Sequence, residues 1–131
     1  MSEFPPLGHV AVTVQSCDAS RPWYGELFGM EPVLDEDTGP FRHVVYAIGG
    51  TLLGLHAFPG GVREPGPFHP YRAGLDHVAF GVADRGELEK WQKTLDDLGV
   101  AHGGIVDAHY GSGLSFKDPD NIALEFFAPP A

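Results

Sequence analysis

The sequence predicts an α+β fold of two tandem β-α-β-β-β modules, whose strands form a curled mixed sheet around a central cleft. The run Leu-Gly-His-Val-Ala-Val-Thr-Val at 7–14 returns at 75–82 as Leu-Asp-His-Val-Ala-Phe-Gly-Val. The final strands also repeat, because Leu-Gly-Leu-His-Ala-Phe at 53–58 aligns with Ile-Ala-Leu-Glu-Phe-Phe at 122–127. The offset is 68 residues for His9 and His77 (77 − 9) and 69 for His56 and Glu125 (125 − 56). A nearly constant offset indicates an internal duplication, with the chemistry between the halves.

The length sets the domain organisation. A chain of 131 residues with 43% apolar content is expected to form a single domain, 1–131. Module one is placed at 7–58 and module two at 75–127. The segment between them, 59–74, is rich in proline and glycine and lacks periodicity, which is typical of a linker.

The first module should start with a strand at 8–14, where β-branched residues alternate between the two faces. A helix follows, with Ser16, Asp18 and Ser20 as N-cap candidates. Pro22 is expected in its first turn, where proline is tolerated, and Gly29 near its end. Strands are predicted at 31–37, 41–48 and 51–58, with turns at 37–40 and 49–50.

The second module repeats this plan. A strand is expected at 75–82, followed by a helix with Asp84 as N-cap and Glu87 three residues later, a variant of the capping box. Gly99 should end the helix. Strands are predicted at 104–109, 112–117 and 122–127. The turn at 118–121 contains proline at its second position and Asn121, which tolerates a positive φ.

Composition excludes several classes of partner. A net charge of −10 and a pI of about 4.9 argue against nucleic-acid binding. No apolar run is long enough to span a bilayer, and the opening Met-Ser-Glu-Phe-Pro-Pro lacks the features of a secretory signal. The single cysteine, Cys17, excludes an internal disulfide and is interpreted as an inert packing or surface residue, not a nucleophile. A cytoplasmic protein with a small-molecule partner, and no membrane partner, is expected.

Strand alternation brings four candidate ligands to one side of the predicted strands. His9, His56, His77 and Glu125 share their faces with small residues, whereas the opposite faces carry large apolar residues that helices should cover. A carboxylate in such a setting is costly unless it is paired or metal-bound. Three imidazoles and one carboxylate suit Zn²⁺, Ni²⁺, Co²⁺, Mn²⁺ or Fe²⁺. The remaining histidines, His43, His69, His102 and His109, are expected at the surface or the pocket rim.

With these features the chain resembles the vicinal oxygen chelate superfamily, which includes glyoxalase I, methylmalonyl-CoA epimerase, extradiol dioxygenases, fosfomycin-resistance enzymes and bleomycin-binding proteins. The resemblance rests on the repeated module, the His-Val-Ala openings, the segment Trp-Tyr-Gly-Glu-Leu-Phe-Gly-Met at 23–30 and the Asp-Pro-Asp…Leu-Glu ending at 118–125. It covers nearly the whole chain. It implies the fold, a divalent metal and a homodimer, but one scaffold of this kind supports many reactions.

The resemblance implies metal ligands on the first and last strands of each module. His9 and His77 would be counterparts, and Glu125 the closing carboxylate. His56 stands where glyoxalase I has glutamate and the epimerases have glutamine. Asn121 stands where the family usually has glycine. In glyoxalase I both metal-bound glutamates also transfer protons, and this chain keeps only Glu125, which leaves His56 as an alternative base.

Three functions follow as alternatives. The first is a metal-dependent lyase, isomerase or oxygenase whose substrate chelates the metal through adjacent oxygens, with Glu125 and His56 as catalytic groups. The ligand spacings of 47, 21 and 48 (56 − 9, 77 − 56 and 125 − 77) resemble glyoxalase I and the epimerases and favour lyase or isomerase chemistry. His9, His77 and Glu125 alone would match the 2-His-1-carboxylate set of Fe(II) oxygenases. His56 would then lie beside the ligands without binding the metal, or donate a proton.

The second alternative is a bleomycin-resistance-like protein that sequesters a drug or metabolite without catalysis. Trp23, Tyr24, Phe28 and Tyr110 could line its aromatic cleft, although core packing also explains Trp23 and Phe28. The third is thiol transfer to an epoxide antibiotic. Neither a phosphonate-binding nor a glutathione-binding set of basic residues is recognisable, because the eight Lys and Arg residues are scattered.

Overall fold

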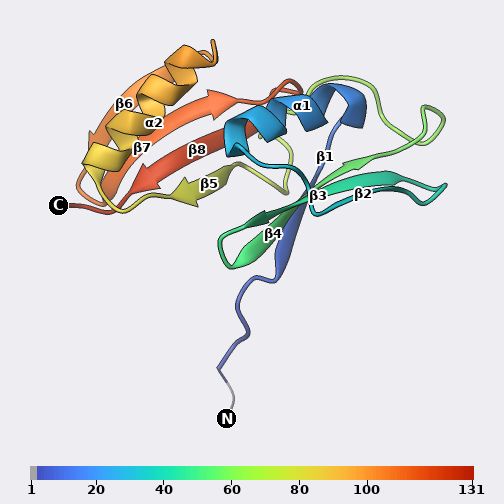
Figure 1. The fold of residues 1–131 in the computed structure, drawn as a ribbon, viewed down its shortest axis with the longest axis horizontal. Helices are drawn as coiled ribbons and strands as arrows, with labels where there is room; N and C mark the ends of the chain where they lie inside the picture. The colour runs from blue at the N-terminus through green and yellow to red at the C-terminus, as the bar shows by residue number, and fades with distance from the viewer. Residues whose placement is uncertain (1–2) are drawn as a thin grey trace. The chain divides into compact units, whose positions relative to one another are not determined.

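The structure is a computed structural model that describes residues 3–131. The expectation about a secretory signal rests partly on Met1 and Ser2, which lie outside these residues. The chain divides into two compact units, Met1–Gly66 and Pro67–Ala131. Each unit has one helix and one four-stranded sheet in the order β-α-β-β-β (Figure 1). The predicted α+β class and the duplicated module are therefore confirmed.

The first unit contains β1 (His9–Thr13), α1 (Cys17–Phe28), β2 (Leu34–Asp37), β3 (Arg42–Ile48) and β4 (Thr51–Ala57). Its sheet has the order β1-β4-β3-β2, in which β1 and β4 are parallel and the other pairs are antiparallel. Gly49 has a φ of 54° in the tight turn that joins β3 to β4. This turn sets the register, so that Ile48 pairs with Thr51 and His43 with His56.

The second unit contains β5 (Val78–Gly81), α2 (Arg85–Asp97), β6 (His102–Ala108), β7 (Gly111–Lys117) and β8 (Ala123–Ala128). Its sheet has the corresponding order β5-β8-β7-β6, with β5 and β8 parallel. The helix α2 lies along one face of this sheet and contacts β6, β7 and β8 (Figure 1). The same layering holds in the first unit, where α1 contacts β3 and β4.

Strand alternation separates a core face from an open face in each sheet. In the first unit Val12, Leu53 and Leu55 are buried on the core face, together with Tyr24 and Leu27 of α1. In the second unit Leu124 and Phe126 of β8 are buried, and Trp91 of α2 stacks on Phe126 with ring centroids 4.4 Å apart. The predicted packing of large apolar residues beneath the helices is confirmed, and the other face of each sheet remains available for polar side chains.

The helix ends follow the predicted capping chemistry, with two exceptions in α1. The Asp84 carboxylate accepts a hydrogen bond of 2.9 Å from the Glu87 amide, as a capping box requires. Gly29 ends α1 with a φ of 65°. Pro22, however, lies inside α1 and not in its first turn, because the helix already begins at Cys17. Ser16 occupies the N-cap position without a side-chain bond to the helix.

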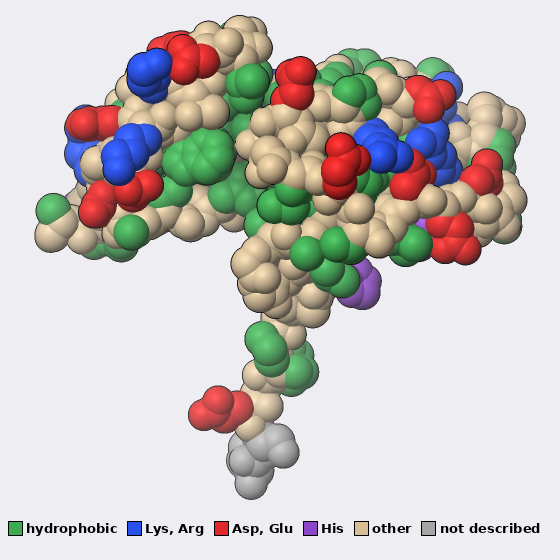
Figure 2. Space-filling model, viewed as in Figure 1, with side chains coloured by type: hydrophobic (Ala, Val, Ile, Leu, Met, Phe, Trp, Pro, Cys, Tyr) green, Lys and Arg blue, Asp and Glu red, His purple; other side chains and the backbone are tan. Residues whose placement is uncertain are grey.

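Charged side chains of both signs are interspersed on the surface. On the face shown in Figure 2, Lys and Arg side chains lie beside Asp and Glu side chains in both units. Along α2 the pairs Arg85–Glu89, Lys90–Glu87 and Lys93–Asp97 account for this mixing. Within residues 3–131, no helix is both long and apolar enough to cross a membrane.

Candidate functional site

The first two candidate residues lie on the open face of the first unit. His9 begins β1 and is exposed, whereas Val12 on the core face is 4% exposed. His56 lies near the end of β4, directly opposite Thr13 of the parallel strand β1. Side chains that pair across neighbouring strands share a face, so His9, Thr13 and His56 all project to the same side. The structure confirms the predicted orientation of both histidines.

His56 belongs to a cluster of aromatic rings. Its imidazole stacks on Phe41, with ring centroids 5.0 Å apart and an interplanar angle of 11°. His43 of β3 pairs directly with His56, and their rings meet edge to face at 5.4 Å. Burial lowers the pKa of His56, and the neighbouring His43 and His9 lower it further. The imidazole is therefore neutral near pH 7, which is the form that binds metals.

His43 was expected only at the surface or the pocket rim, and the structure places it beside a candidate ligand. The signal was present in the sequence. A two-residue turn at 49–50 pairs residues 48 and 51, and this register carries 43 opposite 56. His43 also approaches the Glu36 carboxylate, with 3.4 Å between Nε2 and Oε2.

The other two candidate residues lie in the second unit. His77 was expected inside a strand at 75–82, but the observed strand β5 begins one residue after it, at Val78. Its Nδ1 lies 2.7 Å from Oδ1 of Asp76. Because an ionised carboxylate only accepts hydrogen bonds, this contact requires a proton on Nδ1, and in the neutral imidazole Nε2 is then the nitrogen that could bind a metal. Asp76 is thus an orienting residue that the sequence argument missed.

Glu125 projects from the open face of β8 and is half-buried. Ser115 of β7 pairs with it, and the Ser115 hydroxyl donates a 3.4 Å hydrogen bond to Oε2 of Glu125. Gly113 lies next to the carboxylate, since a Cβ added at Gly113 would stand only 3.0 Å from Oε2. The absence of a side chain at Gly113 therefore creates the space that the carboxylate occupies.

His77 and Glu125 line the same cavity, which has a volume of about 450 Å³. Its aromatic wall is formed by Tyr110 and Phe127, whose rings stack with centroids 6.3 Å apart. Ser115, Gly113 and Gly111 come from β7. The remaining lining residues are Val106 and Ala108, so none of the described residues around this cavity is Lys or Arg. The cavity suits a small molecule with an uncharged, flat portion.

The strand register changes one part of the sequence alignment. In the second unit Glu125 pairs with Ala79, two residues after His77. In the first unit the residue that pairs with Ala11, two residues after His9, is Gly54. Gly54 is therefore the structural counterpart of Glu125, and His56 lies two residues further along β4. The alignment of His56 with Glu125 was wrong, because sequence identity alone did not reveal the different lengths of the two hairpins.

Each unit thus holds two of the four predicted site residues, His9 and His56 in the first and His77 and Glu125 in the second. Among residues 3–131, no three His, Cys, Asp or Glu side chains gather into a cluster that could hold a metal ion. The donor types nevertheless fit a divalent metal, because neutral imidazoles and a carboxylate suit first-row ions. Both His56 and Glu125 also lie beside glycines whose missing side chains leave room for them.

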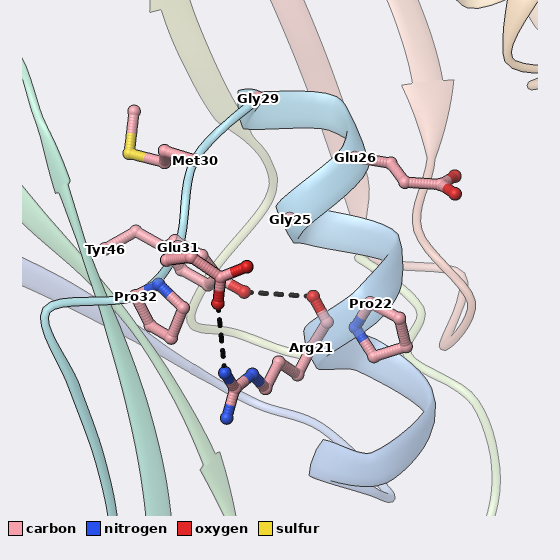
Figure 3. Close-up of a pocket in the computed structure, with 9 residues that line it drawn as sticks. All are labelled: Arg21, Pro22, Gly25, Glu26, Gly29, Met30, Glu31, Pro32 and Tyr46. Atoms are coloured by element: carbon pink, nitrogen blue, oxygen red, sulfur yellow. Dashed lines mark hydrogen bonds and ion pairs between the residues drawn. The ribbon is translucent and has the colours of Figure 1, made fainter.

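Another cavity, of about 680 Å³, lies elsewhere in the first unit. Its lining comes from α1, the segment after it and Tyr46 of β3 (Figure 3). The Arg21 guanidinium binds Glu31 at 3.2 Å, and the Tyr46 hydroxyl donates to the Arg21 carbonyl at 2.9 Å (Figure 3). Arg21 also pairs with Asp35. Because these polar groups bind one another and none is a predicted site residue, we interpret the lining as part of the scaffold.

The remaining predicted residues are distributed as follows. Tyr24 is fully buried between Trp23 and Phe28, so it lines no cleft. Tyr110 is 64% exposed at the cavity of the second unit, as a cleft residue should be. His102 binds Asp96 at 2.7 Å, and His69 and His109 are exposed. Cys17 is buried, where burial raises the pKa of its thiol and disfavours a role as nucleophile.

Comparison with known proteins identifies a family. A family model described as the Glyoxalase/Bleomycin resistance protein/Dioxygenase superfamily matches residues 7–126. A curated relative, a putative ring-cleaving dioxygenase of Bacillus subtilis, is 35% identical over 54 residues. This match covers 41% of the chain and only 17% of the length of that protein.

Solved structures agree with this match. A glyoxylase/bleomycin resistance protein/dioxygenase domain from Frankia sp. EAN1pec is 27% identical, with a TM-score of 0.86 and coverage of 97% of this chain and 99% of that one. A lactoylglutathione lyase from Agrobacterium tumefaciens is 21% identical, with a TM-score of 0.73 and coverage of 95% and 96%. A fosfomycin resistance protein from Listeria monocytogenes is 17% identical, with a TM-score of 0.75 and coverage of 97% and 94%. The last two support the fold alone.

Proposed function

Because the chain belongs to the glyoxalase/bleomycin resistance protein/dioxygenase superfamily, we propose that it is a metal-dependent enzyme acting on a small, uncharged substrate. The substrate would chelate one divalent ion through two adjacent oxygens. His9 and His56 from the first module and His77 and Glu125 from the second would hold this ion. The observation that carries the proposal is the cavity of the second unit, where a half-buried carboxylate and an oriented imidazole face an aromatic wall.

A bound divalent ion would supply Lewis acidity, which polarises a carbonyl and stabilises negative charge on its oxygen. The residues of the chain have separate tasks. Asp76 fixes the His77 ring with Nε2 available. Ser115 donates to the Glu125 carboxylate and thereby steadies the group that would accept a proton from the carbon beside the carbonyl. Tyr110 and Phe127 would hold the apolar part of the substrate.

The absence of cationic side chains among the described lining residues favours uncharged substrates. Substrates with several carboxylates or phosphates bind best where Arg or Lys neutralises them. The three arginines of the first unit have partners there: Arg21 and Arg42 both bind Asp35, and Arg63 donates a hydrogen bond to the Gln15 carbonyl. This argues for a substrate such as an uncharged α-hydroxyketone, and against glutathione or phosphonate recognition in this cavity.

A ring-cleaving dioxygenase is the second candidate, and one observation favours it specifically. Gly54, the counterpart of Glu125, has no side chain, so the matched positions supply only His9, His77 and Glu125. Two histidines and one carboxylate with open positions are the ligands of non-haem Fe(II) oxygenases. The partial match to a putative ring-cleaving dioxygenase points to the same chemistry. The substrate would then be an uncharged catechol.

One experiment separates these functions. The protein is loaded with Zn²⁺, Mn²⁺ or Fe²⁺ and incubated in D₂O with an uncharged α-hydroxyketone, and separately with catechol under oxygen. Isomerase-type chemistry predicts exchange of the carbon-bound hydrogen for deuterium. Oxygenase chemistry predicts consumption of one O₂ per catechol, with iron alone. Glu125→Gln should abolish either reaction, whereas Glu89→Gln on α2 should leave it unchanged. Tight substrate binding without reaction under all conditions would favour sequestration and contradict the proposal.

A further inference from the structure

The segment before β1 carries large apolar side chains that the first unit leaves uncovered. In this segment, residues 3–8, which we call the arm, Phe4 is 95% exposed and Leu7 is 78% exposed. Pro5 and Pro6 lie between them and favour an extended backbone that cannot donate sheet hydrogen bonds. The arm leads away from the sheet of the first unit (Figure 1). Two exposed anchors on a stiff, extended segment are typical of a peptide that docks in an apolar groove.

A groove of suitable chemistry lies beside α1. It is the cavity of about 680 Å³, in which several polar groups already bind one another, so the apolar part of the lining is the surface left for a partner. This part comes from Pro22, Met30 and Pro32, while Gly25 presents the bare backbone of the helix (Figure 3). Met30 and the neighbouring Val33 are exposed. Prolines beside a flexible methionine form a surface that adapts to an aromatic anchor.

The arm is too short to bring both anchors into the groove of its own chain. Leu7 lies two residues before His9, so its backbone stays within about 7 Å of the start of β1. Leu52 of β4 pairs with His9 on one side and with Ala47 of β3 on the other, which puts β3 about 10 Å from β1. The groove begins at Tyr46 of β3 and continues along α1. An arm from another chain has no such restriction.

We propose that the arm docks in the groove of a second copy of this chain, with Phe4 and Leu7 as its anchors. Each copy has one arm and one groove, so the exchange is reciprocal and closes a dimer with two-fold symmetry. One Phe, one Leu and two Pro residues bury about 400 Å², so two arms and the grooves they cover remove about 1,600 Å² from water, the area of a standard stable interface. The exchange requires neither a metal nor a substrate, and so goes beyond the function proposed above.

Sedimentation velocity of the full-length protein over a range of concentrations tests the exchange. We expect a dimer for the wild type. Phe4→Ser should raise its dissociation constant by about 100-fold or more, because the symmetric dimer loses two buried aromatic side chains. Tyr71→Ser is the control and should leave the constant unchanged, since it removes an aromatic side chain that is 92% exposed but lies outside both the arm and the groove.

The groove is tested from its own side. Gly25→Leu should weaken the dimer by a similar factor, because the new side chain fills the space that receives Phe4. Gly25→Ala is the matched control and should change the constant little. Its Cβ makes only ordinary contacts, at 3.6 Å from the Met30 carbonyl and 3.8 Å from the Tyr46 hydroxyl, so the helix accepts it and the groove stays largely open. Circular dichroism establishes that each variant is folded.

A disulfide experiment identifies the groove that receives the arm. Chains with Phe4→Cys are mixed with chains with Met30→Cys and oxidised, and covalent dimers should form in the mixture at a higher yield than in either protein alone. The native Cys17 is buried and should not compete. A chain that carries both substitutions should not close on itself at a concentration far below the dissociation constant of the dimer.

Three results would overturn the proposal. The first is a wild type that stays monomeric at every concentration. The second is a dimer that Phe4→Ser and Gly25→Leu leave unchanged. The third is efficient closure within one chain of the double cysteine variant, which would show that the arm folds back on its own groove. None of these results bears on metal binding or turnover, so each would leave the proposed function standing.

Discussion

Glycines determine where two of the proposed ligands can lie. Gly113 is next to the Glu125 carboxylate, and Gly54 is next to the His56 imidazole. The two contacts differ in tightness. A Cβ at Gly113 would stand 3.0 Å from the carboxylate, whereas a Cβ at Gly54 would stand 3.6 Å from the ring. The same small substitution should therefore have different effects at the two sites.

Gly113→Ala should weaken metal binding, because the new methyl group must displace the Glu125 carboxylate. We expect the dissociation constant for Zn²⁺ to rise by about 10-fold, similar to the loss of an orienting contact. Gly54→Ala serves as the matched comparison and should change it little. The measurement is competition with a fluorescent zinc chelator. Equal effects of the two substitutions would contradict this account of the glycines.

Asp76 should contribute to metal binding without being a ligand. Asp76→Asn can still contact His77 Nδ1, but its amide carries no charge, so the imidazole loses basicity and its tautomer is no longer fixed. The affinity for Zn²⁺ should fall by about 10-fold, with the stoichiometry unchanged. Asp96→Asn, next to His102, is the control, since that histidine is no candidate ligand. A loss of stoichiometric metal in Asp76→Asn would indicate that Asp76 is itself a ligand.

The turn between β7 and β8 positions Glu125. The Asp118 carboxylate accepts hydrogen bonds of 2.8 Å from the amides of Asp120 and Ile122. Asn121 has a φ of 66°, the positive value that the sequence predicted, and its side-chain amide donates to the Phe68 carbonyl at 2.9 Å. Asparagine thus tolerates the positive φ and also makes a side-chain hydrogen bond to Phe68 that glycine could not make.

Asn121→Ala should lower the free energy of unfolding by about 1 to 2 kcal/mol, because alanine loses the bond to Phe68 and tolerates a positive φ poorly. Asn121→Gly should lower the free energy of unfolding less, because glycine adopts a positive φ without strain and loses only the hydrogen bond to Phe68. Urea denaturation of both variants measures the difference. Equal free energies of unfolding for Asn121→Ala and Asn121→Gly would contradict this explanation.

An ion-pair network connects α1 with the sheet of the first unit. Asp35 of β2 binds Arg21 of α1 and Arg42 of β3, and Arg42 also binds Asp18 of α1 at 2.7 Å. Hydrogen bonds from Arg42 and Arg21 hold the pKa of Asp35 below its ordinary value. A carboxyl group whose pKa is lowered by folding stabilises the protein above its ordinary pKa, and this contribution is lost as the pH falls through the lowered value.

Asp35→Asn should therefore destabilise the protein at pH 7 by about 1 kcal/mol, as expected for a network of partly exposed pairs. The difference from wild type should shrink as the pH falls below about 4, the ordinary pKa of aspartate. Thermal unfolding between pH 3 and 7 measures this difference, with Glu26→Gln on α1 as the control. A difference that does not change with pH would show that the charge of Asp35 is not responsible.

The elements could be predicted from sequence more reliably than their register. The helices, the turn at Asn121 and the face on which His9, His77 and Glu125 lie all follow from periodicity and turn chemistry. The pairing of Gly54 with Ala11 could not be predicted in this way. It depends on the lengths of the hairpins, and a single sequence fixes the ends of a hairpin only to within a residue or two. Asp76 was missed for a related reason, since its contact with His77 appears only once the side chains are placed.

At the scale of the whole molecule, the two units each contribute half of the proposed ligand set. A metal that binds ligands from both units and not the unfolded chain must stabilise the fold, by about 2.7 kcal/mol at a free concentration 100 times the dissociation constant. Zn²⁺ should therefore raise the unfolding temperature of the wild type and leave that of Glu125→Ala almost unchanged. An equal rise in both proteins would point to unspecific binding.

The most direct test of the central claim is the metal content of the purified protein, measured without added metal or chelator, beside four single variants. We expect about one divalent ion per chain in the wild type. His9→Ala in the first unit, and His77→Ala and Glu125→Ala in the second, should each lose it, while His69→Ala should retain it. Metal-free wild type that takes up none on incubation would contradict the claim. So would full retention in His9→Ala, because His9 would then not be a ligand.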